Sequence, residues 1–279
     1  MARIRSNAGS LPIELEVYDS GGDGRPVVLV HGWPLSAHSW KPQQTMLESA
    51  GFRVVAYDRR GFGVSDHPDG GYDYDTMAGD LRAIVEHLHL RGMALVGFSM
   101  GGGELARYVG RHGTDDVAAM VFASAVPPYL RKTDDNPEGR LDDDTVREMK
   151  NGLSADRDGF FADFAEKFYT ASGELRVDRD VVENWRALAA PASTRAALDC
   201  IDAFSRTDFR DDLHKIDVPT LVIHGDGDEI VPIDVSGRRT AEMVGDAKLH
   251  IIHGGPHGIL DSHTEEFNEA LLDFLLELR

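Results

Sequence analysis

The sequence is short of cysteine and of basic residues, and it has no long apolar run. Cys200 is the single cysteine, which excludes an intramolecular disulfide and a zinc or iron–sulfur site built from a cysteine cluster. Lysine and arginine number 29 against 48 aspartate and glutamate residues, so the formal net charge is −19. Such a chain repels nucleic acid and anionic membranes, and we expect neither as a partner. The acidic excess indicates either a well-hydrated surface or an adaptation to salt.

Signals for targeting, metals and cofactors are weak. The stretch Met1–Asp19 is mixed and charged, so it predicts neither a signal peptide nor a membrane span, and we expect a cytoplasmic protein. The lone G-x-G at Gly61 and Gly63 lacks the third glycine of a dinucleotide site. His253 and His257 are four apart, but Gly-Gly-Pro between them prevents the helix that a metal-binding pair needs. We therefore predict no metal and no organic cofactor.

Short apolar runs alternate with longer helical patterns along most of the chain. An alternating run at Ile13–Tyr18 predicts an edge strand. Six nearly continuous apolar runs predict buried parallel strands: Val27–His31, Phe52–Tyr57, Met93–Phe98, Val117–Ala123, Thr220–His224 and Leu249–His253. Helices are predicted at about Asp75–His89, Met100–His112, Ile233–Val244 and Thr264–Leu278. This order is typical of an α/β fold with a doubly wound, mostly parallel sheet.

One interval interrupts the alternation of strands and helices. Residues 127–217 contain no convincing buried strand; an acidic, turn-rich stretch at Lys132–Asp144 precedes the helical segments Asp156–Tyr169, Asp178–Ala189 and Ser193–Phe204. Asp142–Asp144 is interpreted as the start of a helix. We predict that residues 127–217 form a helical cap inserted into a core made of residues 1–126 and 218–279.

The strongest motif is Gly97-Phe98-Ser99-Met100-Gly101, which directly follows the apolar strand residues Met93–Val96 and precedes a helix. G-x-S-x-G in this setting is the nucleophile elbow, a sharp turn that presents the serine hydroxyl above the sheet. Its small residues allow close backbone packing, and the helix N-terminus favours negative charge. The alternative, a serine that only caps a helix, explains less of this pattern. Ser99 is therefore predicted to be a nucleophile.

An oxyanion hole is predicted from His31-Gly32-Trp33-Pro34, which follows the strand residues Val27–Val30. In such a fold, one amide comes from this loop and the other from the residue after the nucleophile. That assigns the backbone N–H groups of Trp33 and Met100. Pro34 fixes its own φ and stiffens the loop. The alternative is an ordinary turn in which the aromatic side chain only fills space.

The general base and its orienting acid are predicted from the chain order Ser, then Asp or Glu, then His. His257 lies in Gly254-Gly255-Pro256-His257-Gly258, directly after the last strand, and is favoured over eleven other histidines. Asp226 and Asp228 both follow the strand Thr220–His224. We choose Asp228, because it lies further into the loop and the first aspartate tends to stabilise the turn.

These motifs together resemble one family, the cofactor-free bacterial haloperoxidases or perhydrolases, with their aryl-esterase and γ-lactamase relatives. The resemblance covers nearly the whole chain and is greatest toward the aryl-esterase branch at LDCIDAFSRTDFR and HGDGDEIVP; other matching strings are VVLVHGWPLSAHSW, VVAYDRRGFGVSD, LVGFSMGGGELARYV and GGPHGILDSHTEEFN. It implies an α/β-hydrolase fold, the triad Ser99, Asp228 and His257, no cofactor and a homo-oligomer. It also implies that the acyl pocket is lined by Trp33, Pro34, Val126, Met149, Phe164, Phe204 and Ile230.

The expected function is hydrolysis of short-chain or aryl carboxylic esters through an acyl-enzyme. The Trp33-Pro34 pair resembles that of peracid-forming members, so hydrogen peroxide is expected as a second substrate beside the ester or carboxylic acid. Opening of γ-lactams or other amides and lactones on the same triad is the alternative. A non-catalytic small-molecule receptor on the same fold is a more remote one.

Overall fold

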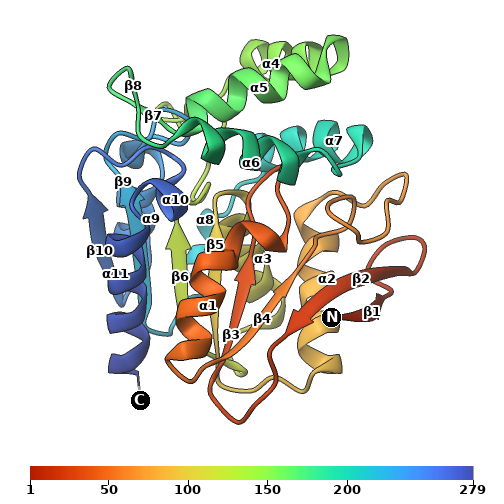
Figure 1. The fold of residues 1–279 in the computed structure, drawn as a ribbon, viewed down its shortest axis with the longest axis vertical. Coiled ribbons are helices and arrows are strands. Elements are labelled where there is room, and N and C mark those ends of the chain that lie inside the picture. Colours follow the sequence, from red (N-terminus) through yellow and green to blue (C-terminus); the bar gives the residue numbers. More distant parts are fainter. Residues whose placement is uncertain (279) are drawn as a thin grey trace.

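The computed structural model describes residues 1–278, and its core is an eight-stranded sheet (Figure 1). The strand order is β1-β2-β4-β3-β5-β6-β9-β10. β1 pairs antiparallel with β2 and β2 with β4, whereas the other neighbours are parallel. The strands are β1 (Ala2–Ser6), β2 (Ile13–Asp19), β3 (Pro26–Val30), β4 (Arg53–Tyr57), β5 (Met93–Phe98), β6 (Val117–Ala123), β9 (Thr220–Gly225) and β10 (Ala247–Ile252).

The inner parallel strands are buried because helices cover both faces of the sheet. Every residue of β5 and β9 is buried, as a strand between two helical layers requires. Figure 1 shows α1 and α11 in front of the sheet and α2 and α3 behind it. Apart from four long helices between β6 and β9, the helices are α1 (Lys41–Ser49), α2 (Tyr74–His87), α3 (Met100–His112), α8 (Arg210–Leu213), α9 (Gly237–Met243), α10 (Ile259–Ser262) and α11 (Thr264–Glu277), with 3₁₀ turns η1 (Ala37–Trp40) and η2 (Ile233–Val235).

The edge of the sheet differs from the prediction. The strand expected at Ile13–Tyr18 exists as β2, but it lies between β1 and β4, so its assignment as an edge strand is wrong. One edge is β10, in which only Ile252 is buried, so the prediction of a buried strand at Leu249–His253 is wrong about its burial, because β10 has a neighbour on one side only. The other edge is β1, a five-residue strand in which only Ile4 and Ser6 are buried. Its sequence, ARIRS, has too little apolar alternation to indicate a strand, and pairing with β2 provides its stability. Helix α1 was also missed, since its polar sequence KPQQTMLES has little apolar periodicity.

Between β6 and β9 the chain forms four long helices: α4 (Asp143–Ala155), α5 (Arg157–Phe168), α6 (Arg179–Ala189) and α7 (Thr194–Arg206). A small hairpin of β7 (Thr170–Ala171) and β8 (Glu174–Leu175) joins α5 to α6. The expected helix start at Asp142–Asp144 is the start of α4, where the Asp142 carboxylate accepts a 2.8 Å hydrogen bond from the Thr145 amide. In Figure 1 the four helices lie beyond the carboxyl ends of the parallel strands. The division at residues 126/127 and 217/218 stays a prediction.

Across residues 1–278, no helix is both long enough and apolar enough to cross a bilayer.

Candidate active site

Ser99 occupies a strained turn between β5 and α3. Its φ of 54° and ψ of −118° place a non-glycine residue in a rarely populated region, which structures tolerate mainly at functional sites. Its amide donates to the Ala123 carbonyl at 2.9 Å, which ties the turn to β6. A Cβ on Gly101 would lie 2.3 Å from the Val30 carbonyl oxygen, so only glycine allows α3 to approach β3 this closely. The strand-turn-helix predicted from G-x-S-x-G is therefore present.

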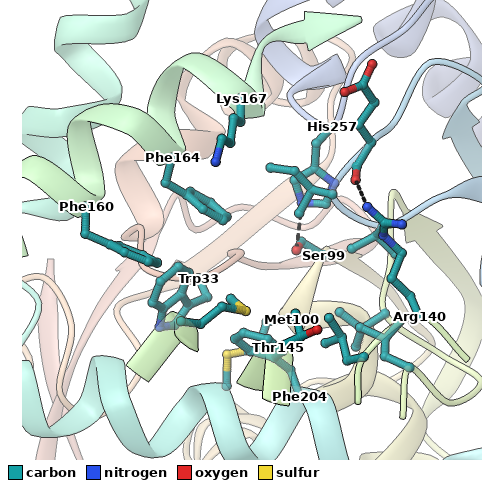
Figure 2. A pocket seen from close by; sticks show the side chains of 17 residues that line it. Trp33, Ser99, Met100, Arg140, Thr145, Phe160, Phe164, Lys167, Phe204 and His257 are labelled. Atoms are coloured by element: carbon teal, nitrogen blue, oxygen red, sulfur yellow. Dashed lines mark hydrogen bonds between the residues drawn. The ribbon is translucent and has the colours of Figure 1, made fainter. Parts of the chain in front are cut away.

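His257 and Asp228 complete a hydrogen-bonded chain that ends on Ser99. The Nε2 atom of His257 lies 2.9 Å from the Ser99 hydroxyl oxygen (dashed in Figure 2), and its Nδ1 lies 2.7 Å from Asp228 Oδ2. All three side chains are buried, and the imidazole packs against the Phe168 and Phe98 rings at centroid distances of 4.9 and 5.3 Å. The structure thus brings together the three residues that the sequence selected.

The environment of Asp228 holds it as an ionised acceptor. Its Oδ1 accepts hydrogen bonds from the amides of Ile230 and Val231 at 2.9 and 2.8 Å. Burial alone would raise the pKa of Asp228, but the neighbouring imidazoles of His257 and His224 hold that pKa well below its usual value. A fixed carboxylate at Nδ1 keeps the proton on that nitrogen and leaves Nε2 free to accept the serine proton.

Asp226, the competing aspartate, has a different role. Its carboxylate lies at the surface, where it accepts from the Gly254 amide at 2.6 Å and lies 2.8 Å from Nδ1 of His253. These contacts join the loop after β9 to the loop after β10 and so favour the approach of His257. The choice of Asp228 over Asp226 agrees with this geometry.

His224 is a contact of the acid that the sequence did not identify. Its buried Nε2 lies 2.8 Å from the Val231 carbonyl oxygen and 3.3 Å from Asp228 Oδ2. The carbonyl can only accept, so the hydrogen lies on Nε2 and also faces the carboxylate. In the sequence, His224 was recognised only as the end of a strand. The structure shows that the loop after this strand folds back and brings Asp228 next to the His224 ring.

The two predicted oxyanion donors lie beside Ser99. Within residues 1–278, the backbone amides of Trp33 and Met100 donate to no protein acceptor, so both are free to bind a ligand oxygen. A Cβ on Gly32 would lie 2.8 Å from the Phe98 ring and 3.2 Å from Ser99 Cβ. Glycine at this position therefore allows the loop after β3 to approach the nucleophile.

A buried charge network holds this loop from behind. Arg59 donates to Glu104 at 2.7 Å and to the His31 carbonyl oxygen at 2.8 Å, and its amide donates to His31 Nε2 at 3.0 Å. Burial first, and then the Arg59 charge, lower the pKa of His31 well below its usual value, so its imidazole is neutral. Removing one member of such a buried pair typically costs about 3–5 kcal/mol, so the network fixes the loop firmly.

A cavity of about 360 Å³ opens above Ser99 and His257. Six of the residues predicted to bind substrate line it: Trp33, Val126, Met149, Phe164, Phe204 and Ile230. The prediction that Pro34 lines the acyl pocket is wrong, because Pro34 is absent from the described wall of this cavity. The wall there is the Trp33 indole, which meets Phe161 and Phe204 edge-on at centroid distances of 5.8 Å each. The indole N–H donates to the Ala197 carbonyl oxygen at 3.1 Å, which joins the loop after β3 to α7.

Several lining residues were missed by the sequence analysis. Arg140, Lys167 and Glu229 add charge to a wall that was expected to be apolar, and the other missed residues are Leu130, Leu141, Thr145, Phe160 and Val231. Most belong to residues 127–217, where no motif marks which side of a helix faces the site.

Among residues 1–278, no group of three or more His, Cys, Asp or Glu side chains is arranged to hold a metal ion.

Three polar residues each follow one of the parallel strands, and this placement defines a class of enzyme. A serine after β5, an acid after β9 and a histidine after β10, all at the carboxyl edge of a mostly parallel sheet, are typical of α/β hydrolases with a serine nucleophile. The sequence profile described as "alpha/beta hydrolase fold" matches residues 25–264. The chain belongs to the α/β hydrolase family.

Individual relatives cover almost the full length of the chain. It is 44% identical over 261 residues to a non-heme chloroperoxidase of Kitasatospora aureofaciens, which covers 92% of this chain and 94% of that protein. It is 41% identical over 266 residues to a bifunctional esterase/perhydrolase of Acinetobacter calcoaceticus, covering 94% and 96%. The crystal structure of a bromoperoxidase from Bacillus anthracis superimposes with a TM-score of 0.93 at 49% identity, over 98% of this chain and 99% of that one. The resemblance to haloperoxidases and perhydrolases is therefore confirmed.

Proposed function

We propose that this protein is a serine hydrolase that cleaves short-chain or aryl carboxylic esters and that forms peracids when hydrogen peroxide is present. The observation that carries the proposal is the hydrogen-bonded chain from Asp228 through His257 to Ser99, beneath two free amides. The esterase/perhydrolase and haloperoxidase relatives support the same chemistry.

Acylation begins at Ser99. Its oxygen attacks the ester carbonyl while Nε2 of His257 takes the hydroxyl proton, and Asp228 stabilises the resulting imidazolium. The amides of Trp33 and Met100 hold the oxyanion of the tetrahedral intermediate, and each such donor typically contributes about 2.7–4 kcal/mol. The intermediate collapses, the alcohol leaves with the proton from His257, and an acyl-enzyme remains.

The acyl-enzyme then reacts with one of two nucleophiles. Water attacks the acyl carbon, passes its proton to His257, and releases the carboxylic acid as Ser99 recovers its proton. Hydrogen peroxide reacts in the same way, but the product is a peracid. A free peracid oxidises bromide or chloride to the hypohalous acid and is itself reduced to the carboxylic acid. This sequence gives halogenation without a metal or an organic cofactor.

The cavity sets the size of the acyl group. A volume of about 360 Å³ is small for a ligand pocket, and the wall is largely aromatic and aliphatic. Such a cavity accepts a short acyl chain or one aromatic ring. The helical segment 127–217 supplies most of that wall, and we propose that it acts as a cap on the core formed by residues 1–126 and 218–279.

A homo-oligomer remains part of the proposal on the strength of the family resemblance, and a cytoplasmic location remains part of it as the default for a chain with one cysteine. Light scattering during size-exclusion chromatography tests the oligomer, since a monomeric mass would refute it. Fractionation of the producing cells tests the location.

Three assays of the wild-type protein test the proposed function: cleavage of 4-nitrophenyl acetate, peroxide-dependent bromination in acetate buffer, and opening of a bicyclic γ-lactam. The proposal expects the first two activities. Lactam opening without ester cleavage would favour the alternative hydrolase, and no turnover in any assay would favour a receptor.

A further inference from the structure

The wall of the cavity has an unusual charge for this chain. The protein carries a formal net charge of −19, yet the ionisable lining residues besides His257 are two cations, Arg140 and Lys167, and one acid, Glu229. Figure 2 shows Lys167 extending from α5 beside Phe164, and Arg140 on the other side of Ser99 and His257. An acidic surface repels anions, so a local pair of cations changes which ligands can approach.

Lys167 has no counter-ion. Within the described residues, its ammonium makes no hydrogen bond and no ion pair. The acid next to it in sequence, Glu166, is held by Arg179 in an ion pair on the exposed side of α5. Phe164 lies one helical turn earlier on the same side of α5 and also lines the cavity. The ammonium is therefore available beside the aromatic wall.

Arg140 likewise lacks a carboxylate partner among residues 1–278. Within that part of the chain its guanidinium makes one long contact of 3.4 Å, to the main-chain oxygen of Glu229. Three acids that follow Arg140 in sequence are engaged elsewhere: Asp142 accepts from the Thr145 amide, Asp143 pairs with Arg131 and Arg206, and Asp144 pairs with Arg147. Most of the donors of the guanidinium remain free for a ligand.

We propose that the positive charges of Arg140 and Lys167, which flank the cavity, attract a carboxylate at the far end of the acyl chain, so that the preferred substrates are half-esters of short dicarboxylic acids. This inference rests on the proposed esterase function. Guanidinium and ammonium groups form charge-assisted hydrogen bonds with carboxylates, and the apolar wall accommodates the methylene chain between the two ends. The ester end reaches Ser99 while the anionic end lies toward one of the two cations and within the electrostatic field of the other.

The test compares monomethyl glutarate with dimethyl glutarate, which has the same chain without the charge. The values of kcat/KM are measured for wild type, Arg140→Met, Lys167→Met and the double variant. Lys132→Met is the matched control, because this exposed lysine precedes α4 but does not line the cavity. Both cavity positions are solvent-exposed, and cleavage of the diester reports whether each variant is folded.

Each single variant is expected to lower kcat/KM for the half-ester about three- to fivefold, as a partly exposed charge pair predicts, and to leave the diester within about twofold. Raising salt from about 0.05 to about 0.5 M should lower half-ester cleavage in wild type but not in the double variant. An equal effect on both esters, or an effect of Lys132→Met as large as that of Lys167→Met, would overturn the inference while leaving the esterase proposal intact. If wild type cleaves neither these esters nor 4-nitrophenyl acetate, the esterase proposal itself fails.

Discussion

Asp228 and His257 are joined by a 2.7 Å hydrogen bond, although 29 residues separate them in the chain. Asp228 follows β9 and His257 follows β10, and these strands are parallel neighbours in the sheet. Their carboxyl ends therefore lie side by side, and each loop contributes one member of the pair. The relationship fixes which nitrogen of His257 carries the proton, and hence whether Ser99 can be deprotonated.

Asp228→Asn tests this relationship. Oδ1 accepts two backbone amides, so the asparagine oxygen would stay there and its NH₂ would face His257 Nδ1. That amide favours the tautomer with the proton on Nε2, which cannot accept from Ser99. We expect kcat for 4-nitrophenyl acetate to fall about 10⁴-fold, as for other triads with this change.

Asp226→Asn is the matched control from the same loop. Its carboxylate forms hydrogen bonds with the Gly254 amide and the exposed His253, both away from Ser99, so kcat should stay within about fivefold of wild type. If the two substitutions lowered kcat equally, the assignment of the acid would be wrong.

Asp228 also predicts a pH dependence of stability. Its pKa is lower in the folded protein than in the unfolded chain, so the stabilisation is complete above the unfolded value of about 4 and is lost as pH falls through the folded pKa. The difference in unfolding free energy between wild type and Asp228→Asn should therefore shrink from pH 7 to about pH 3. Urea denaturation measures it, and a difference independent of pH would contradict the lowered pKa.

Gly32→Ala tests the approach of the oxyanion loop to the nucleophile. The added methyl would meet Phe98 at 2.8 Å and displace the loop that carries the Trp33 amide. We expect kcat to fall about 10²-fold, the usual effect of a displacement near 1 Å at a reacting centre. Gly70→Ala is the control, because no atom lies within 4 Å of its added Cβ. Equal activity of both variants would show that the loop tolerates the displacement.

Pro34→Leu tests the balance between peroxide and water. Proline restricts the loop beside Trp33, and a less restricted loop admits water, which is far more concentrated than peroxide. The ratio of peracid formation to ester hydrolysis should fall, measured by bromination and acid release on the same acyl donor. An unchanged ratio would show that Pro34 does not influence this choice, in line with its absence from the described cavity wall.

The sequence predicted the sheet and the three polar residues because both depend on local patterns. Buried parallel strands are continuous apolar runs, and G-x-S-x-G, the loop at Asp228 and the loop at His257 each follow one of them. β1 escaped prediction because its stability comes from pairing with β2 rather than from its own residues.

The charged part of the cavity wall escaped prediction for a different reason. Arg140 and Lys167 belong to no recognisable motif in the sequence, and their position beside the cavity depends on how the segment between β6 and β9 lies beyond the ends of the strands. His224 was seen as a strand end, although the loop after it turns Asp228 back to within 3.3 Å of its ring. Contacts that depend on tertiary packing produce no periodicity or motif in the sequence, so sequence patterns do not predict them.

Ser99→Ala tests the central claim most directly. Wild-type protein and the variant are incubated with 4-nitrophenyl acetate, and both nitrophenol release and the mass of the Ser99 peptide are measured. The account predicts an acetylated Ser99 in wild type and a loss of about 10⁶-fold in kcat in the variant, comparable to removal of a serine nucleophile elsewhere. Ester cleavage at an undiminished rate by Ser99→Ala would contradict it.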